Sequence, residues 1–127
     1  MKAIILAAGK GSRLGKITEN IPKGMLKLFG KTLLERQIEI YQKCGIEDIT
    51  IVTGYKSEII NFKNINYIKN QNFATTNMNE SLFCASDKLL NSVIISYSDI
   101  IFEDKIIQQM LKFSGDMGIA VNLNWQK

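Results

Sequence analysis

Glycines, a serine and two cationic side chains crowd into residues 9–13, directly after the apolar run at 3–8. In open α/β sheets, ligands bind beyond the carboxyl ends of the strands, so this loop lies where a ligand would sit. Glycines let backbone N–H groups approach an anion closely, and an arginine fork can bind two phosphate oxygens. The stretch therefore predicts a phosphate site with Lys10 and Arg13 as its cations.

Two further charged residues could serve the same site. Lys23 follows Pro22 soon after the loop. Its ammonium could be a point charge that binds a phosphate, or Lys23 could be an ordinary surface lysine. Asp99 follows an apolar run, and a carboxylate at the end of a parallel strand would share the edge of the sheet with the glycines. Carboxylates there commonly hold Mg²⁺ together with substrate phosphates. A helix cap is the alternative role, and Asp104 suits that role better, so we expect Asp99 to bind Mg²⁺.

Two familiar phosphate motifs fit poorly. The dinucleotide pattern G-x-G-x-x-G fails at Leu14, and the P-loop pattern fails because five residues instead of four separate Gly24 from Gly30. The chain also has no histidine, the commonest general base. Phosphoryl transfer suits such a chain, because it needs positioning and neutralised charge more than a protein base.

The elements that must position these residues alternate along the chain. Helical spacing or capping signals mark residues 32–45, 80–90 and 104–113, with a capping box at Thr32 and Glu35 and a C-terminal stop at Gly45. Short runs rich in Ile and Val predict strands at 3–8, 48–54, 65–70, 92–98 and 117–123. This alternation predicts an α/β fold, a Rossmann-like three-layer domain with a mostly parallel sheet. The polar segment 70–79 is interpreted either as a surface loop or as a base-recognition loop.

Composition narrows the class of protein. The length of 127 residues indicates a single domain, 1–127, and no apolar run is long enough for a membrane span. The net charge of +4, without a basic stripe, does not favour nucleic acid as a partner. Cys44 and Cys84 are expected to be free and mostly buried, which together with the missing histidines disfavours zinc and fits a cytoplasmic location.

The order of these pieces resembles the nucleotidyltransferases of the sugar-phosphate pyrophosphorylase type. The match lies in LAAGKGSRL at residues 6–14, in the following Pro22 and Lys23, and in GKTLLERQIE at 30–39, where Thr32 replaces the usual proline. ATTNMNESLFCA at 74–85 and ISYSDIIF at 95–102 resemble the cytidylyltransferase branch, which activates phosphocholine or aminoalkylphosphonates.

The resemblance implies a reaction: CMP passes from CTP to a phosphate or phosphonate acceptor, and pyrophosphate leaves. Arg13 and Lys23 would be catalytic and Asp99 would bind Mg²⁺. The expected nucleotide-binding residues are Leu6, Ala7, Ala8, Gly9, Lys10, Gly11, Ser12, Arg13, Lys23, Asn77 and Ser81. A sugar-1-phosphate nucleotidyltransferase that uses UTP, dTTP or GTP is the alternative enzyme, and a catalytically inactive nucleotide-binding fragment is the alternative of another class.

Members of the resembling family run substantially longer than this chain. We therefore expect the nucleotide half of the site, weak or absent turnover by these 127 residues, and exposed apolar surface that favours homo-oligomers. Trp125 is expected to pack in the core or over the end of a strand.

Overall fold

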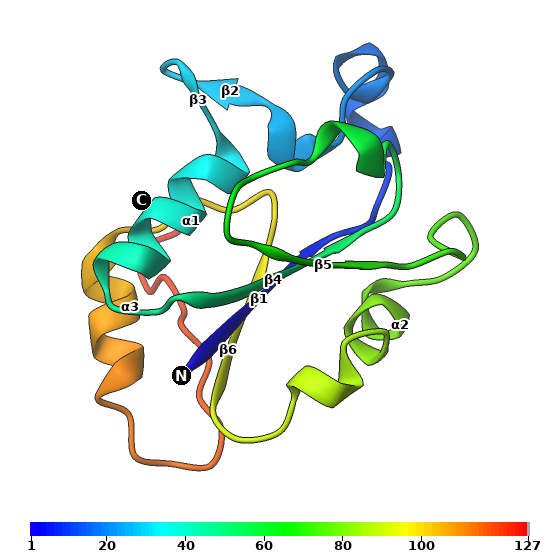
Figure 1. The fold of residues 1–127 in the computed structure, drawn as a ribbon. Helices are drawn as coiled ribbons and strands as arrows, with labels where there is room; N and C mark the ends of the chain where they lie inside the picture. Colours follow the sequence, from blue (N-terminus) through cyan, green and yellow to red (C-terminus); the bar gives the residue numbers. More distant parts are fainter. Residues whose placement is uncertain (127) are drawn as a thin grey trace.

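The computed structural model describes residues 1–126. Its centre is a four-stranded sheet in the order β5-β4-β1-β6 (Figure 1). All neighbouring strands are parallel, which confirms the predicted α/β class. The strands are β1 (Lys2–Ala7), β4 (Asp48–Thr53), β5 (Asn66–Lys69) and β6 (Val93–Tyr97).

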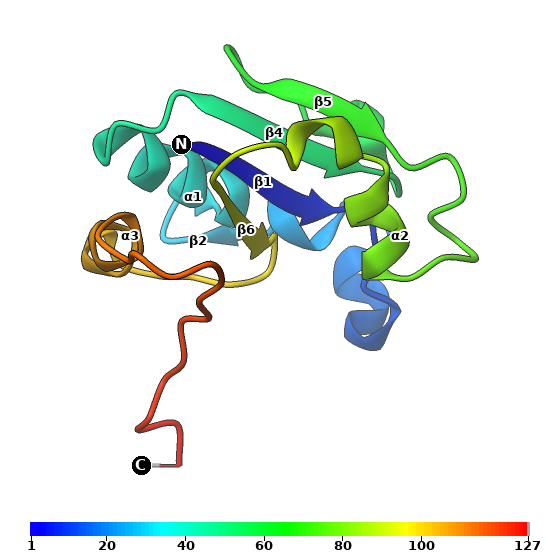
Figure 2. The same ribbon diagram turned by 90° about the horizontal axis from the view of Figure 1, so that it is seen from below.

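Helices cover both faces of the sheet, as its apolar strands require. Helices α1 (Leu33–Lys43) and α3 (Asp104–Leu111) lie on one face, and α2 (Met78–Phe83) lies on the other (Figure 2). Strand β1 divides its side chains between the two layers: Ile5 packs with α1 and α3, whereas Leu6 packs on the α2 side. No described helix combines the length and the apolar character needed to cross a membrane.

Short elements connect these layers. A two-residue antiparallel ladder joins β2 (Lys27–Leu28) to β3 (Lys31–Thr32), just before α1. Turns of 3₁₀ helix are η1 (Ser12–Thr18), η2 (Lys23–Met25), η3 (Ser57–Ile59) and η4 (Ser86–Lys88).

Helix α1 begins and ends where the sequence predicted. The Thr32 hydroxyl accepts a hydrogen bond from the Glu35 backbone N–H at 3.1 Å, which is the N-terminal half of a capping box. Gly45 follows the helix with a φ of +84°, and the Ile46 N–H donates to the Tyr41 carbonyl at 2.9 Å. A left-handed glycine of this kind closes a helix cheaply because it has no Cβ.

Two helix predictions need correction. The helix expected at 80–90 begins earlier, at Met78, and stops at Phe83 before the separate turn η4. Glu103, not Asp104, occupies the N-cap position of α3. Asp104 lies in the first turn, where its carboxylate accepts from Lys43 Nζ at 2.5 Å. This hydrogen bond lowers the pKa of Asp104 and raises the pKa of Lys43.

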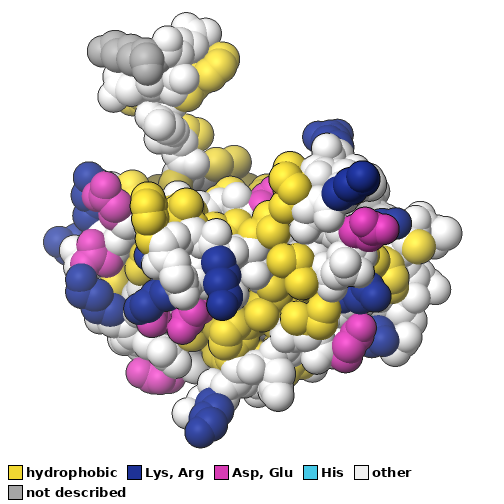
Figure 3. All heavy atoms as spheres, turned by 90° about the horizontal axis from the view of Figure 1, so that it is seen from above, with side chains coloured by type: hydrophobic (Ala, Val, Ile, Leu, Met, Phe, Trp, Pro, Cys, Tyr) yellow, Lys and Arg dark blue, Asp and Glu magenta, His cyan; other side chains and the backbone are white. Residues whose placement is uncertain are grey.

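The strand predicted at 117–123 is wrong. The described part of this segment has no regular structure, and Figure 3 shows the C-terminal segment standing away from the body of the molecule. Its apolar side chains are largely exposed, and Trp125, 75% exposed, does not pack as expected. An alternating pattern forms a strand only where it can pair with the edge of a sheet, and no strand pairing in the described part of the chain includes residues 117–123. The exposed apolar residues are Met117, Ile119, Val121, Leu123 and Trp125.

The two thiols are unpaired, but they are less buried than expected. Cys44 is half-buried beneath α3 and makes a weak hydrogen bond to the Asp104 carbonyl at 3.7 Å. Cys84 is exposed at the end of α2. The neighbouring Ala85 is fully buried and packs on the sheet, whereas Cys84 is exposed, so the expectation of a buried thiol fails there.

Candidate functional site

The carboxyl ends of the four parallel strands form one edge, and backbone hydrogen bonds extend the sheet just past it. The Tyr55 N–H donates to the Ala8 carbonyl at 3.0 Å, and the Asn70 N–H donates to the Thr53 carbonyl at 2.8 Å. The Ser98 N–H donates to the Leu6 carbonyl at 3.0 Å. The segments that follow β1, β4, β5 and β6 are therefore fixed side by side, and they carry most of the predicted site residues.

The glycine loop after β1 depends on Gly11. This residue has a φ of +67°, and a Cβ built on it would lie 2.7 Å from Cγ of Lys23. Thr18, 1% exposed, donates from its hydroxyl to the Gly11 carbonyl at 2.9 Å and holds the loop from below. Gly9 has open space around it. The loop thus needs glycine at position 11 both for its backbone conformation and for the approach of Lys23.

Lys23 and Asp99 meet across the edge. Nζ of Lys23 lies 2.7 Å from Oδ2 of Asp99, and the two side chains are 29% and 36% exposed. Gly24 permits the approach, because a Cβ there would lie 2.7 Å from Cγ of Leu34 and 3.0 Å from Cβ of Ser98. Turn η2 therefore packs closely against both α1 and the end of β6, which brings the predicted cation and carboxylate together.

Gln37 of α1 supports the segment that carries Asp99. Its Nε2 donates to the carbonyls of Tyr97 and Ile100, each at 2.8 Å, and its Oε1 accepts from Ser96 Oγ at 2.9 Å. Gln37 is 1% exposed. The sequence analysis missed this residue, although its spacing from Leu34 and Tyr41 places it on the buried face of α1.

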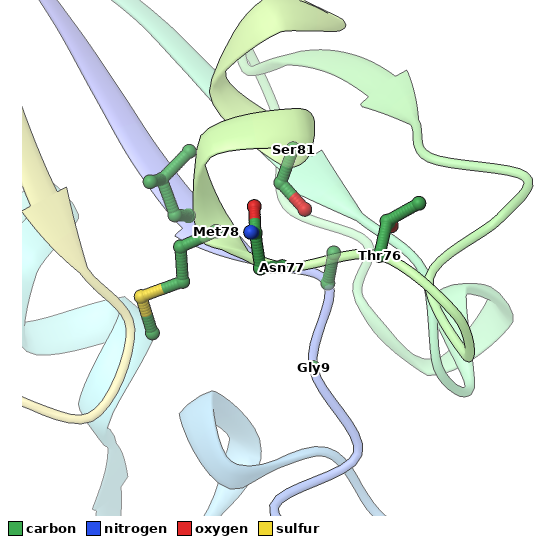
Figure 4. Close-up of a pocket in the computed structure, with 7 residues that line it drawn as sticks. Gly9, Thr76, Asn77, Met78 and Ser81 are labelled. Carbon is green, nitrogen blue, oxygen red and sulfur yellow. The ribbon is translucent and has the colours of Figure 1, made fainter.

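A pocket of about 270 Å³ opens between the glycine loop and the start of α2 (Figure 4). Apolar side chains form part of its wall, and the polar groups come from the segment 76–81. The segment 70–79, interpreted from the sequence either as a surface loop or as a base-recognition loop, thus lines this pocket together with the end of β1. The lining residues are Leu6, Ala8, Gly9, Thr76, Asn77, Met78 and Ser81.

Asn70 organises the polar side of this pocket, and the sequence analysis missed it. Its Nδ2 donates to Thr76 Oγ1 at 2.9 Å and to Ser81 Oγ at 3.0 Å, and its Oδ1 accepts from the Asn72 N–H at 3.0 Å. Asn70 is 3% exposed. Asn77 caps α2, because its Oδ1 accepts from the Glu80 N–H at 3.2 Å.

The remaining predicted residues lie outside this pocket. Lys10 and Ser12 line a second, more open hollow of about 340 Å³ with Gly15, Lys16 and Glu19. The ammonium of Lys10 lies 5.7 Å from the centre of the Tyr55 ring. Arg13 is exposed, and neither hollow includes it. Ala7 is buried, so only its backbone could reach a ligand.

Among the predicted site residues, Asp99 supplies the one carboxylate that could bind a metal ion. In the part of the chain that the structure describes, no three residues among His, Cys, Asp and Glu gather as a metal cluster. Asp99 has its carboxylate at the sheet edge, paired with Lys23. Mg²⁺ needs only one or two carboxylates when phosphates supply other oxygens, so Asp99 fits a magnesium site that phosphate oxygens would complete.

Known proteins resemble this chain in sequence. The family model of the MobA-like NTP transferase domain matches residues 3–124. A CTP:phosphoglutamine cytidylyltransferase of Campylobacter jejuni is 34% identical, and the match covers all of this chain and 54% of that protein. A bifunctional sugar-1-phosphate nucleotidylyltransferase/acetyltransferase of Sulfurisphaera tokodaii is 35% identical over 83% of this chain and 26% of that protein.

A solved structure resembles this one closely. The CTP:phosphocholine cytidylyltransferase of Streptococcus pneumoniae superposes with a TM-score of 0.74 and 34% identity, over 82% of this chain and 49% of that one. The chain therefore spans about half the length of these cytidylyltransferases.

Proposed function

Since the chain belongs to the MobA-like NTP transferase domain family, we propose that it transfers CMP from CTP to a small phosphate or phosphonate acceptor and releases pyrophosphate. The acceptor class is that of phosphocholine or an aminoalkylphosphonate. Residues 1–127 would form one nucleotide-binding domain of this enzyme. The two unpaired thiols suit a reducing compartment such as the cytoplasm.

One observation carries the proposal. A single sheet edge holds a pocket bounded by Gly9 and Ser81, the glycine loop, and the pair of Lys23 and Asp99. A nucleoside triphosphate needs these three environments: a pocket for the base, backbone N–H groups for the phosphates, and a cation with a carboxylate where phosphate charge is handled.

The chain's residues would act by positioning and by neutralising charge. Backbone N–H groups of the glycine loop would bind the triphosphate, with Arg13 facing the leaving pyrophosphate and Lys23 the α-phosphate. An acceptor oxygen that is already anionic attacks the α-phosphorus in line, and the bond to pyrophosphate breaks. No protein base is required, in keeping with a chain that has no histidine.

Lys23 and Asp99 would exchange partners during this process. Without ligand, the Lys23 ammonium is held by Asp99. An incoming phosphate competes for that ammonium, and the Asp99 carboxylate is then free to hold a cation. Mg²⁺, when bound there, would neutralise phosphate charge and help to orient the oxygens.

The sugar-1-phosphate alternative has specific support, because the Sulfurisphaera relative carries that activity in its name. In that case UTP, dTTP or GTP would replace CTP. The cytidylyl assignment is favoured by two relatives named for CTP, one of which also has the same fold at a TM-score of 0.74.

The test is thermal unfolding with CTP, UTP, ATP, GTP or dTTP, each with and without Mg²⁺. A ligand at a hundred times its Kd adds about 2.7 kcal/mol of stability, a rise in Tm on the order of 10 °C for a domain of this size. We expect the largest rise with CTP and Mg²⁺, and we expect Asp99→Ala to abolish the Mg²⁺-dependent part.

Asp116→Ala is the matched control, because it removes an exposed carboxylate from the C-terminal segment. An equal or larger rise with UTP, dTTP or GTP would transfer the assignment to the sugar-1-phosphate enzymes. Absence of any rise would reject nucleotide binding by this chain.

A further inference from the structure

We propose that Asn70 sets the direction of hydrogen bonding in the pocket, so that Ser81 donates to N3 of cytosine and Asn77 donates to O2, which disfavours uracil. The inference rests on the proposed function, which supplies a pyrimidine nucleotide as the ligand. It goes beyond that function by assigning the selection between CTP and UTP to three side chains, one of which lies behind the pocket wall.

The orientation of the Asn70 amide is fixed by its backbone partner. The Asn72 N–H can only donate, so the oxygen of the Asn70 amide must face it, and they lie 3.0 Å apart. The amide nitrogen then faces the other way, with one hydrogen for Thr76 Oγ1 at 2.9 Å and one for Ser81 Oγ at 3.0 Å. Both hydroxyl oxygens therefore act as acceptors toward Asn70.

The two hydroxyls differ in where their own protons go. The Thr76 hydroxyl donates to the Asn72 carbonyl at 2.8 Å, away from the cavity. The Ser81 hydroxyl is 5% exposed and lines the cavity, and it donates to no protein acceptor among residues 1–126. A buried hydroxyl without an acceptor costs free energy, so a ligand that offers an acceptor there is favoured. Of the two, Ser81 is thus the hydroxyl that can donate into the pocket.

Asn77 adds a second donor on the same side. Its Oδ1 is held by the Glu80 N–H at 3.2 Å, so its amide nitrogen is the end left for a ligand. Figure 4 shows Asn77 and Ser81 on the same segment, across the pocket from Gly9. The side chains therefore present two donors, while Leu6, Ala8 and Met78 provide apolar wall for a flat ring.

This arrangement distinguishes two pyrimidines that have nearly the same shape. Cytosine carries adjacent acceptors, O2 and the unprotonated N3. Uracil keeps O2 but has a hydrogen on N3, which would meet a donor and leave both groups unpaired. Unpaired buried polar groups are what makes a binding site selective between isosteres.

The experiment measures the Kd of CTP and of UTP by titration calorimetry with the 127-residue chain and its variants. Ser81→Ala removes one donor and should weaken CTP about tenfold, the size of one hydrogen bond, with a smaller effect on UTP. Asn70→Asp replaces the two N–H donors by a carboxylate oxygen. The Ser81 proton should then turn toward that carboxylate and present a lone pair to the base, so the preference for CTP should fall at least about tenfold.

Asn79→Asp is the matched control, because it adds the same charge at an exposed position of α2 and should leave the ratio of the two Kd values unchanged. Binding of inorganic tripolyphosphate reports on the glycine loop and should survive in every variant that folds. If Asn70→Asp does not fold, the change of ratio in Ser81→Ala alone decides.

The outcomes separate this inference from the proposed function. CTP binding with an unchanged ratio in both variants would overturn the inference and leave the proposed function standing. Failure of the unmodified chain to bind either nucleotide would overturn both. A ratio that falls in Ser81→Ala, and falls further in Asn70→Asp, supports the assignment.

Discussion

Lys23 Nζ and Asp99 Oδ2 lie 2.7 Å apart although 76 positions separate the two residues in the chain. The pair joins the turn after the glycine loop to the segment after β6. Because the two charges neutralise one another without ligand, each residue is available to a phosphate or a cation only when the other is released. The site is therefore expected to respond to phosphate and Mg²⁺ together rather than separately.

Removal of the Lys23 ammonium should slow nucleotidyl transfer. Relative to the weak turnover expected of the unmodified chain, we expect Lys23→Ala to lower the rate of pyrophosphate release on the order of 10²–10³-fold, the size seen when one charge-stabilising donor is lost. Arg13→Ala should have an effect of similar size, whereas Lys27→Ala, at an exposed position of β2, should have little. Turnover close to normal in Lys23→Ala would refute its catalytic assignment.

The glycine loop can be tested through stability. Gly11→Ala should lower the free energy of unfolding by about 1–2 kcal/mol, because a left-handed backbone is strained for alanine and its Cβ would clash with Lys23. Gly9→Ala meets nothing within 4 Å and has no positive φ, so chemical denaturation should show little change. Equal losses in the two variants would contradict the close approach of Lys23 to Gly11.

Gln37→Leu tests the support beneath Asp99. It leaves the Tyr97 and Ile100 carbonyls without their donor, and we expect a loss of about 3 kcal/mol in unfolding free energy. The Mg²⁺-dependent part of the CTP-induced rise in Tm should also shrink. Gln108→Leu on the exposed side of α3 is the control. A destabilised variant that keeps the full Mg²⁺ response would show that Gln37 serves the fold only.

Tyr41 should make the fold sensitive to alkali. Burial raises its pKa from 10.0 to about 12. The Ser96 hydroxyl lies close enough to oppose this shift slightly, but it donates to Gln37, and Tyr41 Oη has no hydrogen-bond partner of acceptable geometry among the described residues. Above the ordinary pKa of 10.0 the unfolded chain loses this proton while the folded chain keeps it. Stability is therefore full below that pH and falls as pH rises through the folded pKa.

The size of this alkaline loss follows from the shift, at about 1.4 kcal/mol per pKa unit and so roughly 3 kcal/mol in all. Tyr41→Phe should remove this part of the decline, as measured by urea unfolding at several pH values between 9 and about 12. Because Tyr41 Oη has no partner of acceptable geometry, the variant should keep most of its stability at pH 7. An identical decline in both proteins would assign the alkaline sensitivity to other groups.

Sequence patterns predicted the central sheet and its covering helices well, but they did not predict the buried side chains that hold the site residues in place. Strands β1, β4 and β6 are rich in apolar residues, and the alternation of strands with helices along the chain favours a parallel sheet with its ligand edge. Asn70 escaped notice because a buried amide and a surface amide look the same in a loop sequence. Gln37 lies at helical spacing from Leu34 and Tyr41, but its polar side chain suggested an exposed position. The alternation at 117–123 misled for the opposite reason, since a local pattern cannot show whether a partner strand is present.

The unpacked C-terminal segment has a practical consequence. Strand β6 pairs only with β1 among the described strands, so it offers an open edge, and the segment carries alternating apolar residues on the same molecule. Each copy thus carries an unpaired sheet edge at β6 and an extended apolar segment that could pair with the β6 edge of another copy. Protein concentration then becomes a variable in every titration and melting curve, and a dilution series should accompany each of them.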